Sequence, residues 1–154
     1  MVQSSGPDYY RPWATPPATP DAIDAYLKRG RRPTHEHYLV CRNRDDAIAA
    51  VINLNEIVRG AFQSAYLGYH GCRSLGGRGY VTEGLRLVAK EAFLGLKLHR
   101  LEANVQPGND RSRRVAERAG FRYEGLARRY LKIRGRWRDH EHWVLLREEW
   151  RGSG

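Results

Sequence analysis

The sequence predicts one α/β domain built around a mixed sheet. With 154 residues, of which 41% are apolar, the chain is long enough to bury a sizeable core within a single domain. Short strand-like runs lie on both sides of a segment with the helical period, at 81–96, and of a second helical segment, 109–119, that has a cap and a stop signal. Turns rich in glycine or proline separate these runs, and the chain closes with a hairpin. This alternation of strands and helices is typical of an α/β domain with a mixed sheet.

The first 20 residues are expected to form an extended arm. Five of the seven prolines fall there, and such a density prevents a regular helix or a central strand. The arm has three aromatic residues that would pack it onto the domain: Tyr9, Tyr10 and Trp13. A disordered leader is the alternative. The domain itself is then expected to cover residues 21–150.

The first half of the domain is predicted to contain a short helix and three strands. The helix begins at Thr19-Pro20-Asp21, which offers a capping hydroxyl and a first-turn proline, and it ends at Gly30. The predicted strands are 36–42, 47–54 and 63–69, with the turn Asn43-Arg44-Asp45-Asp46 between the first two.

The second half alternates helices and strands before the closing hairpin. The long helix, 81–96, has apolar residues at helical spacing. A strand at 100–105 ends before Pro107-Gly108, and Asn109 caps a second helix that reaches Ala119 and stops at Gly120. The closing hairpin is predicted at 121–133 and 137–146, around Arg134-Gly135.

The turn Gly76-Gly77-Arg78-Gly79-Tyr80 joins the third strand to the long helix. Such a turn leaves several backbone N–H groups unpaired at the positive end of a helix, an arrangement that binds phosphate. Gly77 and Gly79 would let a pyrophosphate approach the backbone closely. A structural tight turn uses the same residues and stays the alternative, since the turn fits neither the Walker pattern nor the dinucleotide fingerprint.

Charge and cysteine content narrow the class of protein. A net charge of +10 is consistent with nucleic acid, a ribosomal surface or an anionic cofactor. Compositional drift explains it equally well, because arginine greatly outnumbers lysine. Cys41 and Cys72 are too few for a disulfide framework and lack metal-ligand spacing. With no membrane-length apolar run and no signal-peptide pattern, we expect a cytoplasmic protein without a metal site or membrane contact.

Four short blocks, in order over roughly residues 36–147, resemble the GNAT superfamily of N-acetyltransferases. Within it they are most similar to the clade that acetylates the N-terminal alanine of a ribosomal protein. The blocks are Val58-Arg59-Gly60-Ala61-Phe62 with Tyr66-Leu67-Gly68-Tyr69; Gly77-Arg78-Gly79-Tyr80 with Glu83 and Leu85; His99-Arg100-Leu101-Glu102-Ala103-Asn104; and Asn109-Asp110-Arg111-Ser112 through Ala119-Gly120-Phe121, Glu124-Gly125 and Tyr130-Leu131 to Trp137-Arg138-Asp139-His140. The resemblance implies a mostly antiparallel sheet with a central splay and flanking helices. Of the strand and helices that the family normally has before the first hairpin, only 21–30 would remain.

The resemblance implies acetyl-CoA as the donor and a site for it. The pyrophosphate would lie on the amides of Gly77 to Val81. The pantetheine arm would lie like an extra strand between the strands 67–71 and 100–105, because an amide-rich arm needs backbone partners. The expected cofactor-binding residues are His70, Gly71, Gly77, Arg78, Gly79, Tyr80, Val81, Asn104, Asn109, Ser112 and Arg118. Arg113 is a further candidate for the phosphates, and the alternative for both Arg113 and Arg118 is an exposed helix arginine without a role.

Ser112 and Glu102 are the candidate catalytic residues. Ser112 would protonate the departing thiolate, or else is only a first-turn hydroxyl beside the Asn109 cap. Glu102 would order a water that activates the acceptor, although an ion-paired sheet residue is the favoured alternative. Ala116 stands where many members of the family have a tyrosine general acid, Asn104 where some have a glutamate, and Gly76 where the family usually has glutamine or arginine. His140 and His142 share a strand face that fits acceptor contact or a surface role better than a metal site.

The expected function is acetyl transfer to a primary amine. An α-amine titrates near about 7.7–8.0 and a lysine near about 10.4, so a site without a clear base favours an α-amine. A protein N-terminus, such as that of a ribosomal protein, is therefore the expected acceptor. The alternatives are a small-molecule amine, or a CoA-binding or ribosome-associated protein without turnover. A second copy of the chain would cover an exposed sheet edge as a homodimer.

Overall fold

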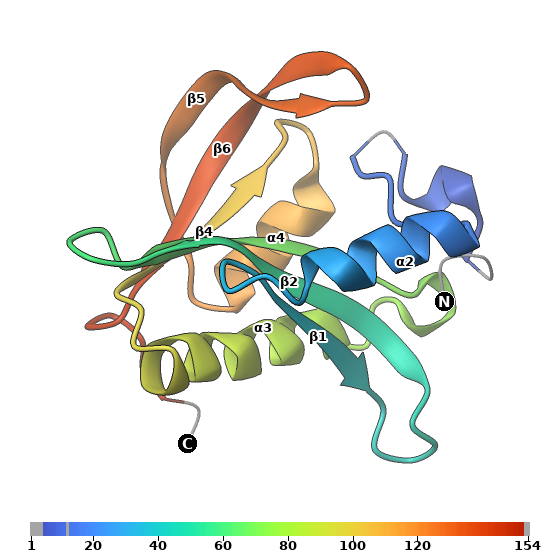
Figure 1. The fold of residues 1–154 in the computed structure, drawn as a ribbon, viewed down its shortest axis with the longest axis horizontal. Coiled ribbons are helices and arrows are strands. Elements are labelled where there is room, and N and C mark those ends of the chain that lie inside the picture. The colour runs from blue at the N-terminus through green and yellow to red at the C-terminus, as the bar shows by residue number, and fades with distance from the viewer. Residues whose placement is uncertain (1–4, 12, 153–154) are drawn as a thin grey trace.

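A computed structural model describes residues 5–11 and 13–152, and it contains one six-stranded sheet in the order β1-β2-β3-β4-β6-β5 (Figure 1). Only β3 and β4 are parallel; the other neighbours are antiparallel. This confirms the predicted α/β class and the mostly antiparallel sheet. The strands are β1 Glu36–Cys41, β2 Ile48–Val58, β3 Ser64–Gly71, β4 Arg100–Val105, β5 Arg122–Ile133 and β6 Arg136–Leu146.

Three α-helices flank the sheet. The hydroxyl of Thr19 caps α2 by accepting a hydrogen bond from the amide of Ala22, at 3.3 Å. In the part of the chain that the structure describes, no helix is long and apolar enough to cross a bilayer. The helices are α2 Pro20–Arg29, α3 Tyr80–Lys90 and α4 Asp110–Arg118, with short 3₁₀ turns η1 Pro7–Tyr9 and η2 Arg73–Leu75 and a π-helical turn η3 Glu91–Gly95.

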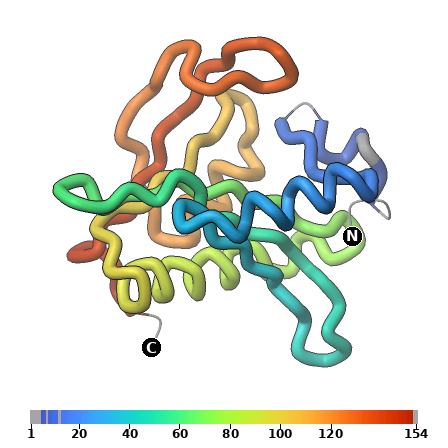
Figure 2. Tube along the Cα trace, viewed as in Figure 1, coloured from blue at the N-terminus to red at the C-terminus, as the bar shows by residue number. Residues whose placement is uncertain are grey.

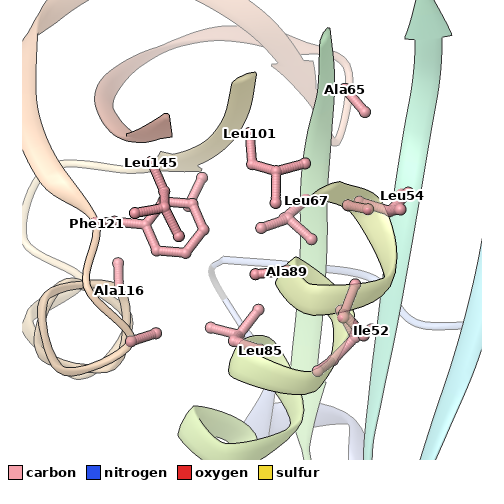
Figure 3. Packing of buried hydrophobic residues seen from close by; sticks show 14 of the residues in the cluster. Ile52, Leu54, Ala65, Leu67, Leu85, Ala89, Leu101, Ala116, Phe121 and Leu145 are labelled. Atoms are coloured by element: carbon pink, nitrogen blue, oxygen red, sulfur yellow. The ribbon is translucent and has the colours of Figure 1, made fainter. Parts of the chain in front are cut away.

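One core lies between the sheet and the helices α3 and α4 (Figure 3). Alternate strand residues point into it, so the residues between them face the other side of the sheet. There α2 crosses β2, where the hydroxyl of Tyr26 donates to Oδ1 of Asn53. The side chains that Figure 3 labels in this core are Ile52, Leu54, Ala65, Leu67, Leu85, Ala89, Leu101, Ala116, Phe121 and Leu145.

Two elements differ from their predicted bounds by four residues or more. The helix predicted over 81–96 ends as an α-helix at Lys90 and continues as the π turn, in which the amide of Leu96 donates to the carbonyl of Glu91. The second strand continues to Val58 rather than ending at Leu54, because β3 pairs with it through an irregular register between Asn55 and Val58.

The sheet opens at its centre. β3 and β4 pair only from Ser64 with Arg100 to Leu67 with Ala103. β3 nevertheless continues to Gly71 and β4 to Val105. Beyond the last pair the two strands are no longer partners in the described structure, which is the central splay that the resemblance implies.

The arm lies against the open end of this splay (Figure 2). Tyr10 is only 5% exposed, and its hydroxyl donates to the carbonyl of Gly71 at 3.2 Å. The side chain of Gln106, after β4, donates to the carbonyl of Trp13 at 3.0 Å. These aromatic residues therefore fix the described part of the arm to the domain. The boundary between arm and domain at residues 20 and 21 stays a prediction.

Candidate active site

The turn between η2 and α3 presents free backbone amides. Gly77 and Gly79 adopt left-handed conformations, with φ of +76° and +84°, and a Cβ at either position would meet nothing within 4 Å. Gly79 is the N-cap of α3, and the first helical bond runs from the amide of Glu83 to the carbonyl of Gly79. Among the described residues, no amide from 77 to 82 donates a backbone hydrogen bond. The amide groups are thus available to an anion, with the positive end of α3 behind them.

A cleft runs from this turn to the splay. Its wider part, of about 320 Å³, lies between the turn and α4. A smaller hollow of about 120 Å³ continues it toward the end of β3 and the arm. The two parts share the residues Gly71, Val81, Arg111 and Val115, so they form one continuous path. We call this path the long cleft. Of the residues expected to bind a cofactor, it is lined by His70, Gly71, Gly77, Gly79, Tyr80, Val81, Asn109, Ser112 and Arg118.

Three arginines of α4 face the wider part of the cleft: Arg111, Arg114 and Arg118. The first two were not predicted, although their spacing from Arg118 is helical and places all three on one side of α4. Arg113 points elsewhere, because its guanidinium forms two hydrogen bonds with Glu141, at 2.8 and 3.1 Å. Its pairing matches the alternative that Arg113 has no role at the phosphates.

Gly76 makes room for one of these arginines. A Cβ there would lie 2.7 Å from Nη2 of Arg111, and the same guanidinium lies 5.1 Å from the ring centroid of Tyr9 in the arm. The family usually has a glutamine or arginine side chain at the position of Gly76. In this chain the Arg111 side chain, coming from α4, fills the space that such a residue would use.

Two hydroxyl groups meet where the long cleft reaches the splay. The hydroxyl oxygens of Tyr69 and Ser112 are 2.8 Å apart, and Tyr69 is also 3.2 Å from the carbonyl of Ser112. Burial raises the pKa of Tyr69 to about 12, so the phenol is protonated at neutral pH. The side chain of Asn109 accepts from the amide of Ser112 at 3.2 Å and caps α4. Ser112 is thus both a first-turn residue and part of the cleft. Its partner, Tyr69, comes from β3.

His70 and Asn104 lie on the two strands that separate. Burial lowers the pKa of His70 to about 4, so its imidazole is neutral at physiological pH. Both polar atoms of the Asn104 amide are buried and have no hydrogen-bond partner among the described residues. Buried amides are normally bonded, so a ligand or water is expected at this position. Arg78 belongs to the turn and lies outside the long cleft, beside α3.

Glu102 is held in an ion pair. Nε of Arg100 donates to its carboxylate at 2.8 Å, and the other side of the guanidinium binds Glu124. These bonds raise the pKa of Arg100, chiefly through Glu124, and lower the pKa of Glu124. The arrangement matches the ion-paired alternative for Glu102, and a role in catalysis stays a prediction. Ala116 is fully buried in the core, so its position on α4 does not face the cleft.

His140 and His142 lie on the sheet face away from α3 and α4. His140 is only 2% exposed, and its Nδ1 lies 3.0 Å from the carbonyl of Arg138. His142 stands directly opposite Asn104 in the β4–β6 ladder. Within residues 5–11 and 13–152, no three histidine, cysteine or acidic side chains come close enough together to hold a metal ion.

The arrangement suits a long, anionic ligand. Free amides and three guanidinium groups at one end can bind a diphosphate. Unpaired strand edges at the other end can bind an extended chain that carries amides. The ligand would end beside the Tyr69–Ser112 hydroxyl pair and the unpaired amide of Asn104.

Comparison with known proteins agrees with this geometry. A family model described as an acetyltransferase (GNAT) domain matches residues 2–122. The "Probable N-acetyltransferase YjcK" of Bacillus subtilis (strain 168) is 42% identical over 124 residues, which are 80% of this chain and 68% of that protein. The "[Ribosomal protein uS5]-alanine N-acetyltransferase" of Escherichia coli (strain K12) is 38% identical over 103 residues, 67% of this chain and 53% of that one.

A solved structure shows the same fold with a bound coenzyme. Mycobacterium smegmatis RimJ in complex with CoA-disulfide superposes with a TM-score of 0.74 and 32% identity, over 84% of this chain and 61% of that chain. The present chain therefore spans between 53% and 68% of the length of these three relatives.

Proposed function

The chain belongs to the GNAT family of acetyl-CoA-dependent acetyltransferases, and from this premise we propose that it acetylates the α-amino group at the N-terminus of a protein, with a ribosomal protein as the acceptor. The proposed acceptor is supported by the 38% identity with an enzyme named for acetylating an alanine of a ribosomal protein. Acetyl-CoA as the donor is supported by the row of free backbone amides opposite three arginines in the long cleft.

We assign the two ends of acetyl-CoA to the two ends of the long cleft. The pyrophosphate would accept hydrogen bonds from the amides of residues 77–82. The side chains of Arg111, Arg114 and Arg118 would neutralise the remaining phosphate charge. The pantetheine arm would pair with the backbone of Gly68 to Gly71 in the splay, where β4 no longer does. The hydroxyl of Tyr10, which binds the carbonyl of Gly71, would have to share that carbonyl or move.

The hydroxyl pair at the end of the cleft fits the departure of the thiol. As the bond between sulfur and the acetyl carbon breaks, the thiolate needs a proton. Ser112 would donate it, with Tyr69 bonded to the same oxygen to replace it. Because the pKa of the Tyr69 phenol is about 12, the phenol keeps its proton and can donate it throughout the physiological pH range.

An α-amine suits this site better than a lysine side chain. At neutral pH a useful fraction of α-amino groups is already uncharged, since their pKa is about 7.7–8.0. A lysine side chain, near about 10.4, would need a strong base beside it. The one carboxylate predicted for that role, Glu102, is held by Arg100.

Acetylation of matched acceptors tests the proposal. The purified chain is incubated with acetyl-CoA and one of three acceptors: a peptide that begins with alanine, the same peptide with a blocked N-terminus and an internal lysine, or spermidine. Products are counted by mass spectrometry, because the exposed thiol of Cys41 would react with reagents that detect free CoA. We expect acetylation of the free N-terminus alone.

Preference for spermidine would show a small-molecule acetyltransferase instead. Tight binding of acetyl-CoA with no product from any amine would show a CoA-binding protein without turnover. Either result would contradict the proposed acceptor.

The setting and assembly are also proposals. We place the reaction in the cytoplasm, where acetyl-CoA meets newly made ribosomal proteins. β1 is an edge strand of the sheet and carries Leu39, which is 59% exposed, so its edge is where a second copy would pair. Light scattering of the purified chain distinguishes a monomer from such a dimer.

A further inference from the structure

Three buried polar atoms without partners lie side by side on the face of the sheet opposite the cofactor helices. They are the two amide atoms of Asn104 and Nε2 of His142, and none has a hydrogen-bond partner among the described residues. Asn104 and His142 face each other across the β4–β6 ladder, so their side chains emerge on the same side. Buried polar atoms are rarely left unpaired, and three on adjacent residues indicate a place for a polar ligand or water.

This pair borders the splay. The last β3–β4 partners are Leu67 and Ala103, so Asn104 is the first β4 residue with its strand edge toward the opening. His142 lies on β6, one strand farther from the splay, directly opposite Asn104. Residues directly opposite each other on neighbouring strands have Cβ atoms about 4.5–5.5 Å apart. The His142 imidazole is therefore within reach, directly or through one water, of a group held at the splay beside Asn104.

The pair and the hydroxyl groups of the long cleft lie on opposite faces of the sheet. Ala103, Val105 and Trp143, the neighbours of Asn104 and His142, are buried in the core with α3 and α4. Since side chains alternate along a strand, Asn104 and His142 point the other way. Ser112 lies on α4 and is therefore on the helix side. An acceptor amine arriving at Asn104 would therefore approach from the sheet face opposite the Tyr69–Ser112 pair.

The groups around the imidazole of His142 are neutral or ion-paired. On β5, the ring of Tyr130 stands edge-on at 4.6 Å between centroids, and burial raises the pKa of this phenol, so it is neutral. On β6, burial lowers the pKa of His140, which is also neutral. On β4, the positive charge of Arg100 is matched by two carboxylates.

These two carboxylates are Glu102, from β4, and Glu124, from β5. On β3, Tyr66 is paired with Glu102, and burial raises the pKa of its phenol. The group that the sequence suggested as base, Glu102, is occupied, whereas Nε2 of His142 is free.

We propose that His142 is the base that removes the proton from the acceptor nitrogen. This inference rests on the proposed N-acetyltransferase function. The nitrogen forms a bond with the acetyl carbon and the carbon–sulfur bond breaks. The surplus proton on nitrogen passes to Nε2 of His142, directly or through one water held by Asn104. The thiolate takes a proton from Ser112, which Tyr69 replaces. His142 then releases its proton to solvent, and the Ser112–Tyr69 pair recovers one from solvent, so each group returns to its starting state. The reaction thus consumes no other reactant.

Chemical rescue tests this assignment. The His142→Ala variant is compared with the unaltered chain on a peptide with an N-terminal alanine, with and without added imidazole. A general base contributes typically about 10²–10⁴-fold, so we expect kcat to fall by about that factor. The dissociation constant for acetyl-CoA, measured by calorimetry, should stay within about twofold, which also shows that the variant is folded.

Added imidazole should restore part of the lost rate in the alanine variant, in proportion to its uncharged form. His142→Gln fills the space without offering a base and should be slow and not restored. His99→Ala is the matched control, because this histidine is half exposed, comes just before β4 and is paired with Glu148 at 3.4 Å. It should keep full activity with or without imidazole.

Two results would overturn the inference while leaving the proposed function in place. One is a His142→Ala rate within about threefold of the unaltered chain. The other is a large loss that imidazole does not restore at any concentration. Absence of turnover in the unaltered chain would instead overturn the proposed function, and this inference with it.

Discussion

Replacing Gly79 with valine perturbs the proposed phosphate site with little effect on packing. Gly79 has φ of +84°, and the position of its Cβ is empty to beyond 4 Å, so the new side chain meets no protein atom. The folded state must nevertheless hold a β-branched residue in the left-handed region, which costs roughly 1–2 kcal/mol. For a chain of this size that lowers the melting temperature by roughly 2–8 °C.

The effect on cofactor binding should be much larger than the effect on stability. The valine side chain would stand where the pyrophosphate approaches the amides of Gly79 and Tyr80. Hydrogen bonds to a charged group contribute about 1.5–3 kcal/mol each. The loss of two of them amounts to about 3–6 kcal/mol, or about 10²–10⁴-fold in the dissociation constant.

Calorimetry with acetyl-CoA measures the affinity, and thermal unfolding measures the stability. Gly135→Val is the matched control: its φ is +80°, its Cβ position is equally open, and it lies at the tip of the β5–β6 hairpin. The control should lose the same stability and bind acetyl-CoA normally. An affinity of the Gly79→Val variant within about threefold of the unaltered chain would refute the phosphate site at this turn.

Three further predictions follow from the site. Arg114→Ala should weaken acetyl-CoA binding by about tenfold, since it removes one charge-assisted phosphate contact. Arg113→Ala, which loses its pairings with Glu141 and Asp110, should leave the dissociation constant unchanged, and equal effects of the two variants in calorimetry would contradict the assignment. Tyr69→Phe should lower kcat by about tenfold or more without changing acetyl-CoA affinity, because Ser112 loses its hydroxyl partner; an unchanged kcat in steady-state assays would count against the relay. The pKa of His70 in the folded state, about 4, lies below its unfolded value near 6.5, so the folded protein binds fewer protons and loses stability as the pH falls from 6.5 to 4. Denaturant unfolding at pH 7 and pH 4 should show about 2–3 kcal/mol less loss for a His70→Gln variant than for the unaltered chain, and equal losses would refute the burial of a neutral imidazole.

The order of elements was predictable from sequence because local features set it. The cap at Asn109, the stop at Gly120 and the turn at Arg134-Gly135 each act within a few residues, and the structure has the expected helix or hairpin at each place. The extension of β2 to Val58 was not predictable in this way, because pairing with β3 extends it across polar residues. No local sequence feature predicts the π turn after Lys90 either.

The site was predictable only in part, for a similar reason. The glycine turn is local, so its amides and left-handed glycines could be expected. The bond between Tyr69 and Ser112 joins residues 43 positions apart, and only the packing of α4 on β3 brings them together. The helical spacing of Arg111, Arg114 and Arg118 was present in the sequence, but only the structure shows which side of α4 faces the cleft.

The position of the arm was the least predictable feature. It depends on the carbonyl of Gly71 at the open end of the splay, which Tyr10 reaches from 61 residues away. The proline content of the arm indicates an extended chain but does not predict where on the domain the arm packs. The contact between the arm and the long cleft could therefore be found only in the folded protein.

The central claim, that backbone amides at the start of α3 bind the diphosphate of acetyl-CoA, can be measured directly. Amide signals of ¹⁵N-labelled protein report each N–H separately as acetyl-CoA is added. The account predicts that the amides of residues 77–82 shift most and saturate together, while that of Gly135 stays in place. Saturating binding that leaves the amides of 77–82 unmoved would contradict it.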